Sequence, residues 1–389
     1  MAFGDGEYRG RLVKVRAAMA DAGIDVLVEC DPANMNYLTG YDGWSYYIPQ
    51  CAVVFVDRDL PLWIGRGMDL SGARLTCFMP ENCVMAYPED LFGWADRHPM
   101  QFVAAEIISR GGGKRRVGAA RDCQQMTPRM RDALAAALPE SRLIDGDLVV
   151  NRVRLVKSPA EIAKMREAAR IAELVATAFR EAVRPGVREC DVAAELQRVA
   201  TAGTAEYGGD YPASVPFLLA GPQAHTTHLT WTERRFGANE TVCLQFGAVR
   251  QRYHCVLART IHLGKPQAAL VELDAIVMEG SEAALQAARP GARCEDVEAA
   301  WRKVISRHGL SKEQRIGYPI GIGYPPDWGE GTASFRPGDK TILAPNMTFH
   351  LFLGMWSAER SHVASETIRI TETGAELLAN VPRNMLVKT

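Results

Sequence analysis

The sequence predicts an α+β protein of two domains, in which an α/β N-terminal domain precedes a duplicated C-terminal domain. Three observations support this. The chain has 389 residues, which exceeds the size at which a single hydrophobic core usually stops growing. Its first part alternates helical and strand patterns. Its second part contains the same turn motif twice, each time after a long helical pattern.

The N-terminal part alternates helix and strand patterns. Apolar residues have helical spacing over residues 8–22, and Gly23 follows as a stop signal. Short apolar runs after this helix are typical of buried strands. This alternation predicts an α/β domain. The expected strands cover residues 24–28, 52–56 and 60–64, and the expected helices cover residues 100–110 and 128–138.

The boundary between the domains is expected near residue 155. Ser158-Pro159-Ala160-Glu161 has the form of a capping box, in which Ser158 accepts a bond from a free amide and Glu161 reaches back. A helical pattern then runs from Ile162 to about Ala182. We therefore divide the chain into residues 1–154 and 155–389.

The second part contains an internal repeat. Arg184-Pro185-Gly186 recurs 105 residues later as Arg289-Pro290-Gly291, and in both copies an Asp-Val pair then opens another helix. A β-rich stretch follows each copy. A repeat of this length predicts two related halves rather than a solenoid. Two such halves that share one core would enclose a cavity.

Composition excludes several classes of protein. Hydrophobic residues make up 47% and charged residues 23%, which is typical of a folded globular chain. The net charge of −1 gives no basic excess for nucleic acid. No apolar run is long enough to span a membrane, and the N-terminus lacks the signal-peptide pattern. The nine cysteines are scattered without a CxxC pair, which favours reduced thiols and a cytoplasmic location.

The α/β domain, the Lys157–Ile162 segment (KSPAEI) and the duplicated C-terminal domain together resemble the creatinase, prolidase and methionine aminopeptidase superfamily. The resemblance implies the pita-bread fold. Metallopeptidases of that superfamily bind two metal ions with two Asp, one His and two Glu. Those positions fall here on side chains that cannot form such a shell, so we expect no metal and no other cofactor. They are Gln245, Val256, the His-free segment Pro319–Gly323, Phe352 and Ser365.

Within the superfamily, the chain looks similar to the ectoine hydrolase branch through long and rare motifs. One departure matters, because this branch carries a Glu where the chain has Gln245, and an amide cannot act as a base or a nucleophile. The motifs are residues 41–45, 98–100, 208–212, 228–231, 252–255, 264–266, 324–330, 347–350 and 379–383.

The resemblance also implies a catalytic histidine. Creatinase hydrolyses a guanidinium C–N bond without metal, and its catalytic His matches His228 in the segment Gly221–His228. Imidazole can take a proton from water and return it to a leaving amine near neutral pH. We expect the neighbouring His225 to be a surface loop residue.

Three further residues complete the predicted catalytic set. Asp210 and Glu366 are candidate carboxylates for holding a cationic substrate, and Gln245 occupies the position of the branch's Glu. Asp210 could instead cap a turn, and Glu366 could be an exposed strand residue.

Aromatic and histidine side chains are candidates for substrate binding, because a cationic amidine is attracted to aromatic faces. His254 and His350 could equally be satisfied core histidines. We expect at least two of the tryptophans to line the site. Trp44 lies in a loop, residues 41–47, that in this superfamily reaches the partner subunit's cavity, so we expect a homodimer. The predicted set is Tyr41, Trp44, Trp231, Tyr253, His254, Trp328, His350 and Trp356.

The resemblance therefore implies a metal-independent hydrolase acting on a C–N bond of a small cyclic amidine or guanidine-type substrate, similar to ectoine hydrolase. Two alternatives stay open. Gln245 could indicate elimination, cyclisation or isomerisation on the same scaffold. The chain could also be a catalytically inactive binding protein. A metallopeptidase is disfavoured by the replaced ligand positions.

Overall fold

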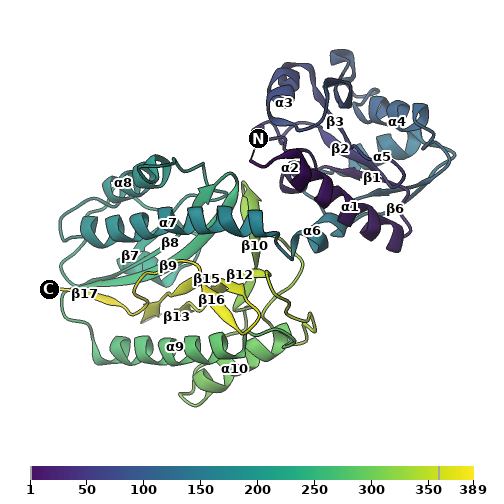
Figure 1. Ribbon diagram of the computed structural model, residues 1–389. Coiled ribbons are helices and arrows are strands. Elements are labelled where there is room, and N and C mark those ends of the chain that lie inside the picture. Colours follow the sequence, from purple (N-terminus) through teal and green to yellow (C-terminus); the bar gives the residue numbers. More distant parts are fainter. Residues whose placement is uncertain (1, 358–359) are drawn as a thin grey trace. The chain divides into compact units, whose positions relative to one another are not determined.

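The computed structural model describes residues 2–357 and 360–389, which form two compact units, Met1–Arg154 and Leu155–Thr389 (Figure 1). Both units combine helices with a β-sheet. Among the described residues, no helix has the length and apolar character needed to cross a membrane. Each unit is described by itself below.

Unit 1 is built on a mixed sheet with the strand order β4-β3-β2-β1-β5-β6. Strand β2 pairs antiparallel with β1 and β3, and the other neighbours are parallel. Helices α4 and α5 pack on the apolar strands to form the core. The strands are β1 (Val26–Glu29), β2 (Cys51–Phe55), β3 (Leu62–Arg66), β4 (Val84–Tyr87), β5 (Arg116–Ala119) and β6 (Arg142–Asp145); the helices are α1 (Asp5–Asp21), α2 (Pro32–Thr39), α3 (Leu70–Thr76), α4 (Met100–Ser109), α5 (Pro128–Ala137) and α6 (Val149–Arg154).

The elements predicted for unit 1 are confirmed, with ends that differ by a few residues. The helix expected at residues 8–22 is α1, which begins earlier, at Asp5. Strands β4, β5 and β6 were not predicted. Each has only four residues, and β6 is partly exposed along its length. The polar ends of β6 leave only Leu143 and Ile144 as apolar residues, so β6 lacks the apolar run by which β1 and β2 could be predicted.

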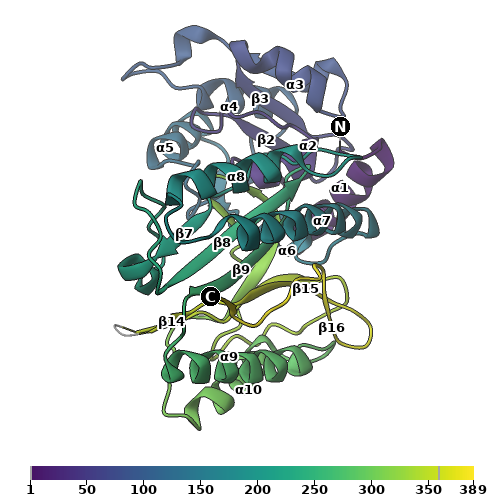
Figure 2. The same cartoon turned by 90° about the vertical axis from the view of Figure 1, so that its left-hand side faces the viewer.

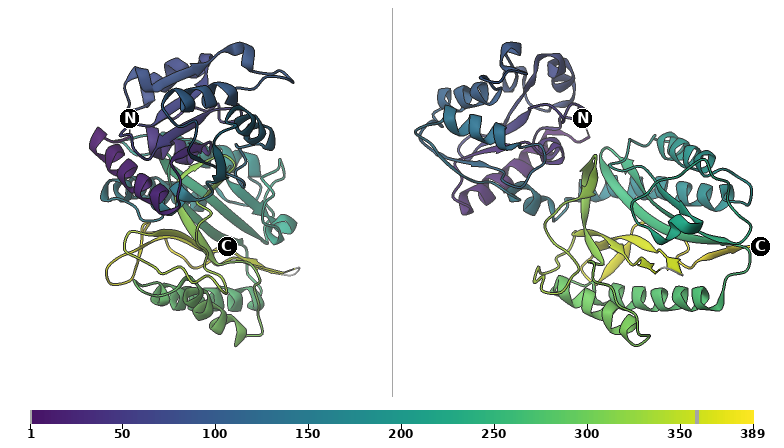
Figure 3. Two further views of the ribbon diagram at one scale, coloured as in Figure 1. Left: turned by 90° about the vertical axis from the view of Figure 1, so that its right-hand side faces the viewer. Right: turned by 180° about the vertical axis from the view of Figure 1, so that it is seen from behind.

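Unit 2 contains a long curved sheet with the order β11-β10-β12-β15-β9-β8-β7. Helix α7 packs on β8 and β9, whereas α9 and α10 share an apolar core with β12 and β15. The strands therefore lie between the pair α7–α8 and the pair α9–α10, as Figures 1 and 2 show, and Figure 3 shows the same layers from behind. The helices are α7 (Pro159–Ala182), α8 (Glu189–Ala202), α9 (Ala268–Ala287) and α10 (Cys294–Ser306); the strands are β7 (Phe217–Ala220), β8 (Glu240–Arg250), β9 (Tyr253–Leu263), β10 (Gly317–Tyr324), β11 (Asp327–Gly329), β12 (Thr348–Phe352), β13 (Met355–Trp356), β14 (Ser361–His362), β15 (Ser365–Ile370), β16 (Ala375–Leu377) and β17 (Leu386–Lys388).

The predicted duplication is visible in the backbone of unit 2. Gly186 and Gly291 have φ angles of 84° and 83°, a region that glycine occupies at little cost. The amide of Gly186 donates to the carbonyl of Phe236 at 2.8 Å, and that of Gly291 donates to Leu343 at 2.9 Å. Each turn is therefore hydrogen-bonded to the segment that leads into a strand of its own half, β8 or β12. The α+β fold with a pita-bread second domain is confirmed.

The start of α7 has the predicted capping box. The backbone amide of Glu161 donates to Ser158 Oγ at 3.2 Å, and the amide of Ser158 donates to Glu161 Oε2 at 2.8 Å. Just before it, Lys157 Nζ lies 2.7 Å from Glu330 Oε2 in a buried ion pair. These contacts hold the first turn of α7 against the segment that follows β11.

Candidate active site

One row of paired residues crosses the inner face of the unit 2 sheet. Phe217 pairs with Gln245, Gln245 with Ala258, Ala258 with Ser365, and Ser365 with Phe352. Side chains directly opposite each other in a sheet point to the same face. We call these five residues the inner row. It contains three of the positions that the resemblance aligns with metal ligands, namely Gln245, Ser365 and Phe352.

The residues at the aligned ligand positions do not fit a pair of metal ions. They offer one amide and one hydroxyl, whereas Val256 and Phe352 contribute only hydrocarbon. Across residues 2–357 and 360–389, no three His, Cys, Asp or Glu side chains come together in a group that could hold a metal. A dinuclear hydrolase site is built from carboxylate and imidazole ligands. No chemical step is therefore assigned to a metal ion here.

His350 belongs to a buried chain of hydrogen bonds beside the inner row. Its Nδ1 lies 2.9 Å from the Tyr318 hydroxyl, and its Nε2 lies 2.7 Å from Ser365 Oγ. The Tyr318 hydroxyl accepts a bond from Trp328 Nε1 at 2.9 Å. Burial lowers the pKa of His350 to about 3, and Arg315 contributes to this shift. The ring is therefore neutral at pH 7 and held by partners on both sides.

His254 is a satisfied core histidine. Its Nδ1 donates to the carbonyl of Arg252 at 2.9 Å, and its Nε2 accepts from the amide of Ala213 at 3.0 Å. A carbonyl can only accept, which fixes the proton on Nδ1. Burial lowers the pKa of His254 to about 4. Both ring nitrogens are engaged, so His254 contributes to packing rather than to proton transfer.

His228 was the predicted site residue, yet it is more exposed than its neighbour His225. His228 is exposed, and its ring meets the Phe217 ring at a centroid distance of 5.8 Å. His225 is half-buried, with Nδ1 2.7 Å from Ser361 Oγ. The turn Gly221–His225 packs on the sheet through the buried Ala224, so His225 is a partly exposed turn residue rather than a fully exposed one.

An array of aromatic rings connects the two ends of the inner row, Phe217 and Phe352. The Trp328 ring lies 6.5 Å from Phe217, 6.2 Å from His254 and 6.4 Å from His350. The Phe352 ring lies 5.3 Å from His350 and 5.4 Å from Trp356. Two of the four predicted tryptophans, Trp328 and Trp356, therefore belong to this array. Trp231 is partly exposed in the loop after His228.

Glu366 does not point toward the inner row. Its Oε1 accepts from Arg259 Nη2 at 2.8 Å, and its strand partner Leu351 belongs to the core under α9 and α10. Side chains alternate along a strand. Because Ser365 faces inward, Glu366 faces the helices. The structure thus corrects the expectation that this carboxylate faces the substrate.

Asp210 has the turn-capping position. It accepts a hydrogen bond from the backbone amide of Gln251, which lies in the β8–β9 turn. Gln251 and Arg252 both have positive φ there. The structure therefore favours the turn-capping alternative for Asp210 over the role of a carboxylate that holds the substrate.

Tyr253, Tyr41 and Trp44 lie away from the inner face or in unit 1. The Tyr253 hydroxyl donates to Glu161 Oε1 at 2.8 Å on the α7 side of the sheet, which corrects its placement among substrate-facing residues. In unit 1, Tyr41 is buried against the Trp63 ring at 4.8 Å, and Trp44 is 56% exposed.

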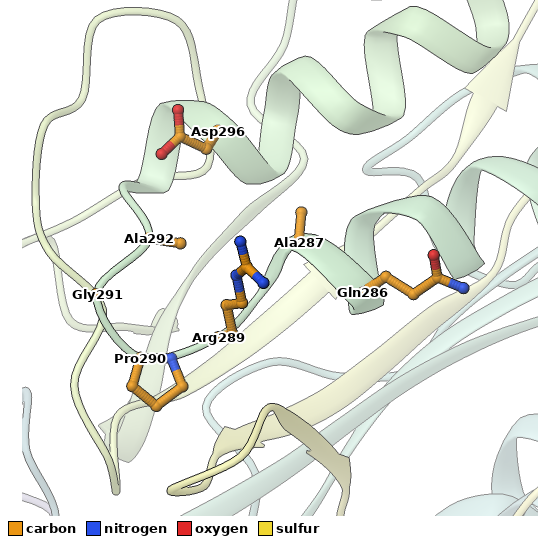
Figure 4. Close-up of a pocket in the computed structure, with 7 residues that line it drawn as sticks. All are labelled: Gln286, Ala287, Arg289, Pro290, Gly291, Ala292 and Asp296. Atoms are coloured by element: carbon orange, nitrogen blue, oxygen red, sulfur yellow. The ribbon is translucent and has the colours of Figure 1, made fainter.

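A surface pocket of about 950 Å³ lies at the second RPG turn (Figure 4). It contains none of the predicted site residues and is open to solvent, so we treat it as distinct from the inner row. Its lining residues are Gln286, Ala287, Arg289, Pro290, Gly291, Ala292 and Asp296.

The sequence analysis did not propose three residues that the structure places at or beside the inner face. Ser365 was identified only as a replaced ligand position. Tyr318 and Lys312 had no signal, since each depends on a partner distant in the sequence. The alternation around Ser365 could have indicated that it faces inward, opposite to Glu366.

Comparison with known proteins identifies the family. The model of metallopeptidase family M24 matches residues 163–375, and that of the creatinase/prolidase N-terminal domain matches residues 11–156. The chain belongs to metallopeptidase family M24. Together with the relatives below, this makes it an enzyme of the hydrolase class within M24.

Two relatives match over almost their whole length. An uncharacterised hydrolase/peptidase, y4tM, of Sinorhizobium fredii is 41% identical over 99% of this chain and 98% of that protein. The ectoine hydrolase of Halomonas elongata is 41% identical over 98% of this chain and 97% of that protein. The crystal structure of dipeptidase PepE from Mycobacterium ulcerans has a TM-score of 0.83 at 22% identity, with 99% of both chains covered, and supports the fold alone.

Proposed function

We propose that this M24 protein is a metal-independent hydrolase that cleaves a C–N bond in a small cyclic amidine or guanidine-type substrate. The observation that carries the proposal is the inner row, which lacks a metal-ligand set and whose Phe217 belongs to an aromatic array that ends at the exposed His228. The relative named ectoine hydrolase supports the substrate class.

The chemistry follows from the charge of the substrate. An amidinium is already cationic, so its central carbon is electrophilic without a Lewis acid. His228 removes a proton from water, and the resulting hydroxide adds to that carbon. The same imidazole then returns the proton to the departing nitrogen, which leaves as an amine while the carbon becomes an amide. One water is consumed for each bond broken.

The aromatic array and neutral acceptors hold the cation in this proposal. Trp328 and Phe217 offer π faces, and the half-buried Gln245 offers a carbonyl oxygen to an amidinium N–H. Glu366 and Asp210 are already engaged by Arg259 and by the Gln251 amide. We therefore assign the binding of the cation to the inner row and its rings.

Gln245 favours one alternative, a reaction that does not consume water. Because its amide cannot serve as the base or nucleophile that a Glu would be, the same site could catalyse elimination, cyclisation or isomerisation. The mass of the product distinguishes the two proposals, since hydrolysis adds one water to the summed products.

The test begins with a screen of ectoine, hydroxyectoine, creatine and related amidines. With the substrate found, His228→Ala is expected to lower kcat by roughly two to four orders of magnitude, the usual contribution of a positioned acid–base group. Substrate affinity should change far less. His228→Asn should fail similarly, because an amide cannot carry the proton.

His308→Ala is the matched control, since His308 is an exposed histidine just after α10. It should leave kcat unchanged. Near-normal kcat in His228→Ala would contradict the assigned mechanism, and the absence of turnover for every amidine would contradict the substrate class.

A further inference from the structure

Lys312 lies in the segment between α10 and β10 with its ammonium against two aromatic rings. Its Nζ is 4.8 Å from the Trp356 ring centroid and 5.3 Å from the Phe352 ring centroid. It donates one hydrogen bond, to the carbonyl oxygen of Gly354. An ammonium has three donors, so this carbonyl uses only one of them.

No acid neutralises this cation within the described part of the chain. Lys312 has no ion pair among those residues. Arg315, three residues on, is exposed; it lies over the Tyr318 ring at 4.3 Å and donates to Ser334 Oγ at 3.2 Å. Burial lowers the pKa of Lys312 to about 7. Burying a lysine ammonium without a counter-charge destabilises the folded protein, and a ligand that supplies a negative charge removes this destabilisation.

The cation lies at the edge of the inner row. Phe352 is the last residue of that row, and its ring contacts His350. Phe352 and Trp356 both pack on the inner apolar cluster of Leu219, Ala224, Cys243, Ala258 and Val363. Lys312 therefore approaches the row at its Phe352 end, whereas His228 meets the row at its Phe217 end.

We propose that Lys312 is the residue that binds the carboxylate of the substrate, at the end of the inner row opposite to His228. This inference rests on the proposed function, which supplies the amidinium. The carboxylate accepts hydrogen bonds from the free donors of Lys312 and restores its counter-charge. The amidinium then lies on the aromatic faces toward Phe217. A zwitterionic substrate therefore interacts with Lys312 at one end of the row and with the aromatic faces at the other, whereas a simple cationic amidine interacts with the aromatic faces alone.

The experiment compares two ligands that differ in the carboxylate alone. Ectoine is a cyclic amidine with a ring carboxylate, and 2-methyl-1,4,5,6-tetrahydropyrimidine is the same ring without it. Calorimetric titration of the full chain at low salt should show that ectoine binds roughly ten-fold to a hundred-fold more tightly, which corresponds to one charge-assisted hydrogen-bonded contact.

Lys312→Met removes the charge and keeps an apolar stem, so it should abolish the preference for ectoine. Lys312→Arg should keep part of it. The exposed Lys303 on α10 provides the control, and Lys303→Met should bind both ligands as the wild type does.

Each possible result of these titrations either supports or overturns the role of Lys312. Equal affinity of the wild type for both ligands overturns this inference and leaves the proposed function intact. A preference that survives in Lys312→Met overturns the assignment to Lys312. Failure of the wild type to bind either ligand overturns the inference, and together with no turnover in the amidine screen it overturns the proposed function as well. If Lys312→Met does not fold, which circular dichroism reveals, the wild-type comparison and Lys312→Arg still decide.

Discussion

The histidines show how the environment of a residue decides its chemistry. His254 and His350 are buried with both ring nitrogens engaged, whereas His228 is exposed at the end of the aromatic array. Burial keeps the first two neutral, because a charged imidazolium would lose its hydration. Of these three histidines, only His228 has a ring that is exposed to solvent.

The Tyr318 hydroxyl is expected to stabilise the unit, because it is the partner of both Trp328 Nε1 and His350 Nδ1. Tyr318→Phe leaves these two groups without a partner. We expect the free energy of unfolding to fall by roughly 1–3 kcal/mol, measured by urea denaturation.

Tyr207→Phe is the control for this measurement. Tyr207 is partly buried, and the hydrogen bond from its hydroxyl to the carbonyl of Glu167 is long, at 3.4 Å. Its loss should change the free energy of unfolding by less than about 0.5 kcal/mol. Equal effects of the two substitutions would contradict the importance of the Tyr318 chain.

At the scale of elements, the strands decide which side chains meet. Ser365 and Glu366 are adjacent on β15 but face opposite sides of the sheet, toward His350 and toward Arg259. The register of β12, β15, β9, β8 and β7 then assembles the inner row from five strands. A one-residue slip in any strand would replace its inward residues with helix-facing ones.

The buried histidines on β9 and β12 predict a dependence of stability on pH. The folded pKa values of His254 and His350 are about 4 and about 3, below the ordinary value of about 6.5. Below that value the unfolded chain binds protons that the folded chain does not. The stabilisation is therefore present above about pH 6.5 and is lost as the pH falls toward the folded pKa values.

Each of these histidines should lower the free energy of unfolding by about 1.4 kcal/mol per pH unit in that window. Urea denaturation between about pH 7 and pH 5 measures the slope. His254→Asn should reduce the slope by the contribution of one histidine. An unchanged slope in this variant would show that His254 titrates alike in both states.

At the scale of the whole molecule, the replaced ligand set predicts an enzyme that works without a transition metal. Gln245, Val256 and Phe352 cannot form the carboxylate shell that a metal pair needs. We expect elemental analysis of the purified protein to find no stoichiometric metal. Dialysis against EDTA should leave activity unchanged, and added Mn²⁺ should not raise it. One or two metal ions per chain, or activity that EDTA removes, would contradict this prediction.

The sequence determined features that depend on residue type and short-range pattern. The duplicated RPG turns, the capping box of Ser158 and Glu161, and the loss of the metal-ligand set could all be predicted from it. Each of these follows from residues close together in the chain or from the identity of one side chain. A glycine turn or a missing carboxylate keeps its meaning in any context.

Only the tertiary structure decided which of the candidate groups are available to a substrate. Glu366 and Asp210 have partners 107 and 41 residues away, and Lys312 contacts aromatic rings on the distant strands β12 and β13. Such contacts depend on strand register and on the packing of distant segments. The free energy of a charged side chain is set by those neighbours, so composition and spacing could name the candidates but could not choose among them.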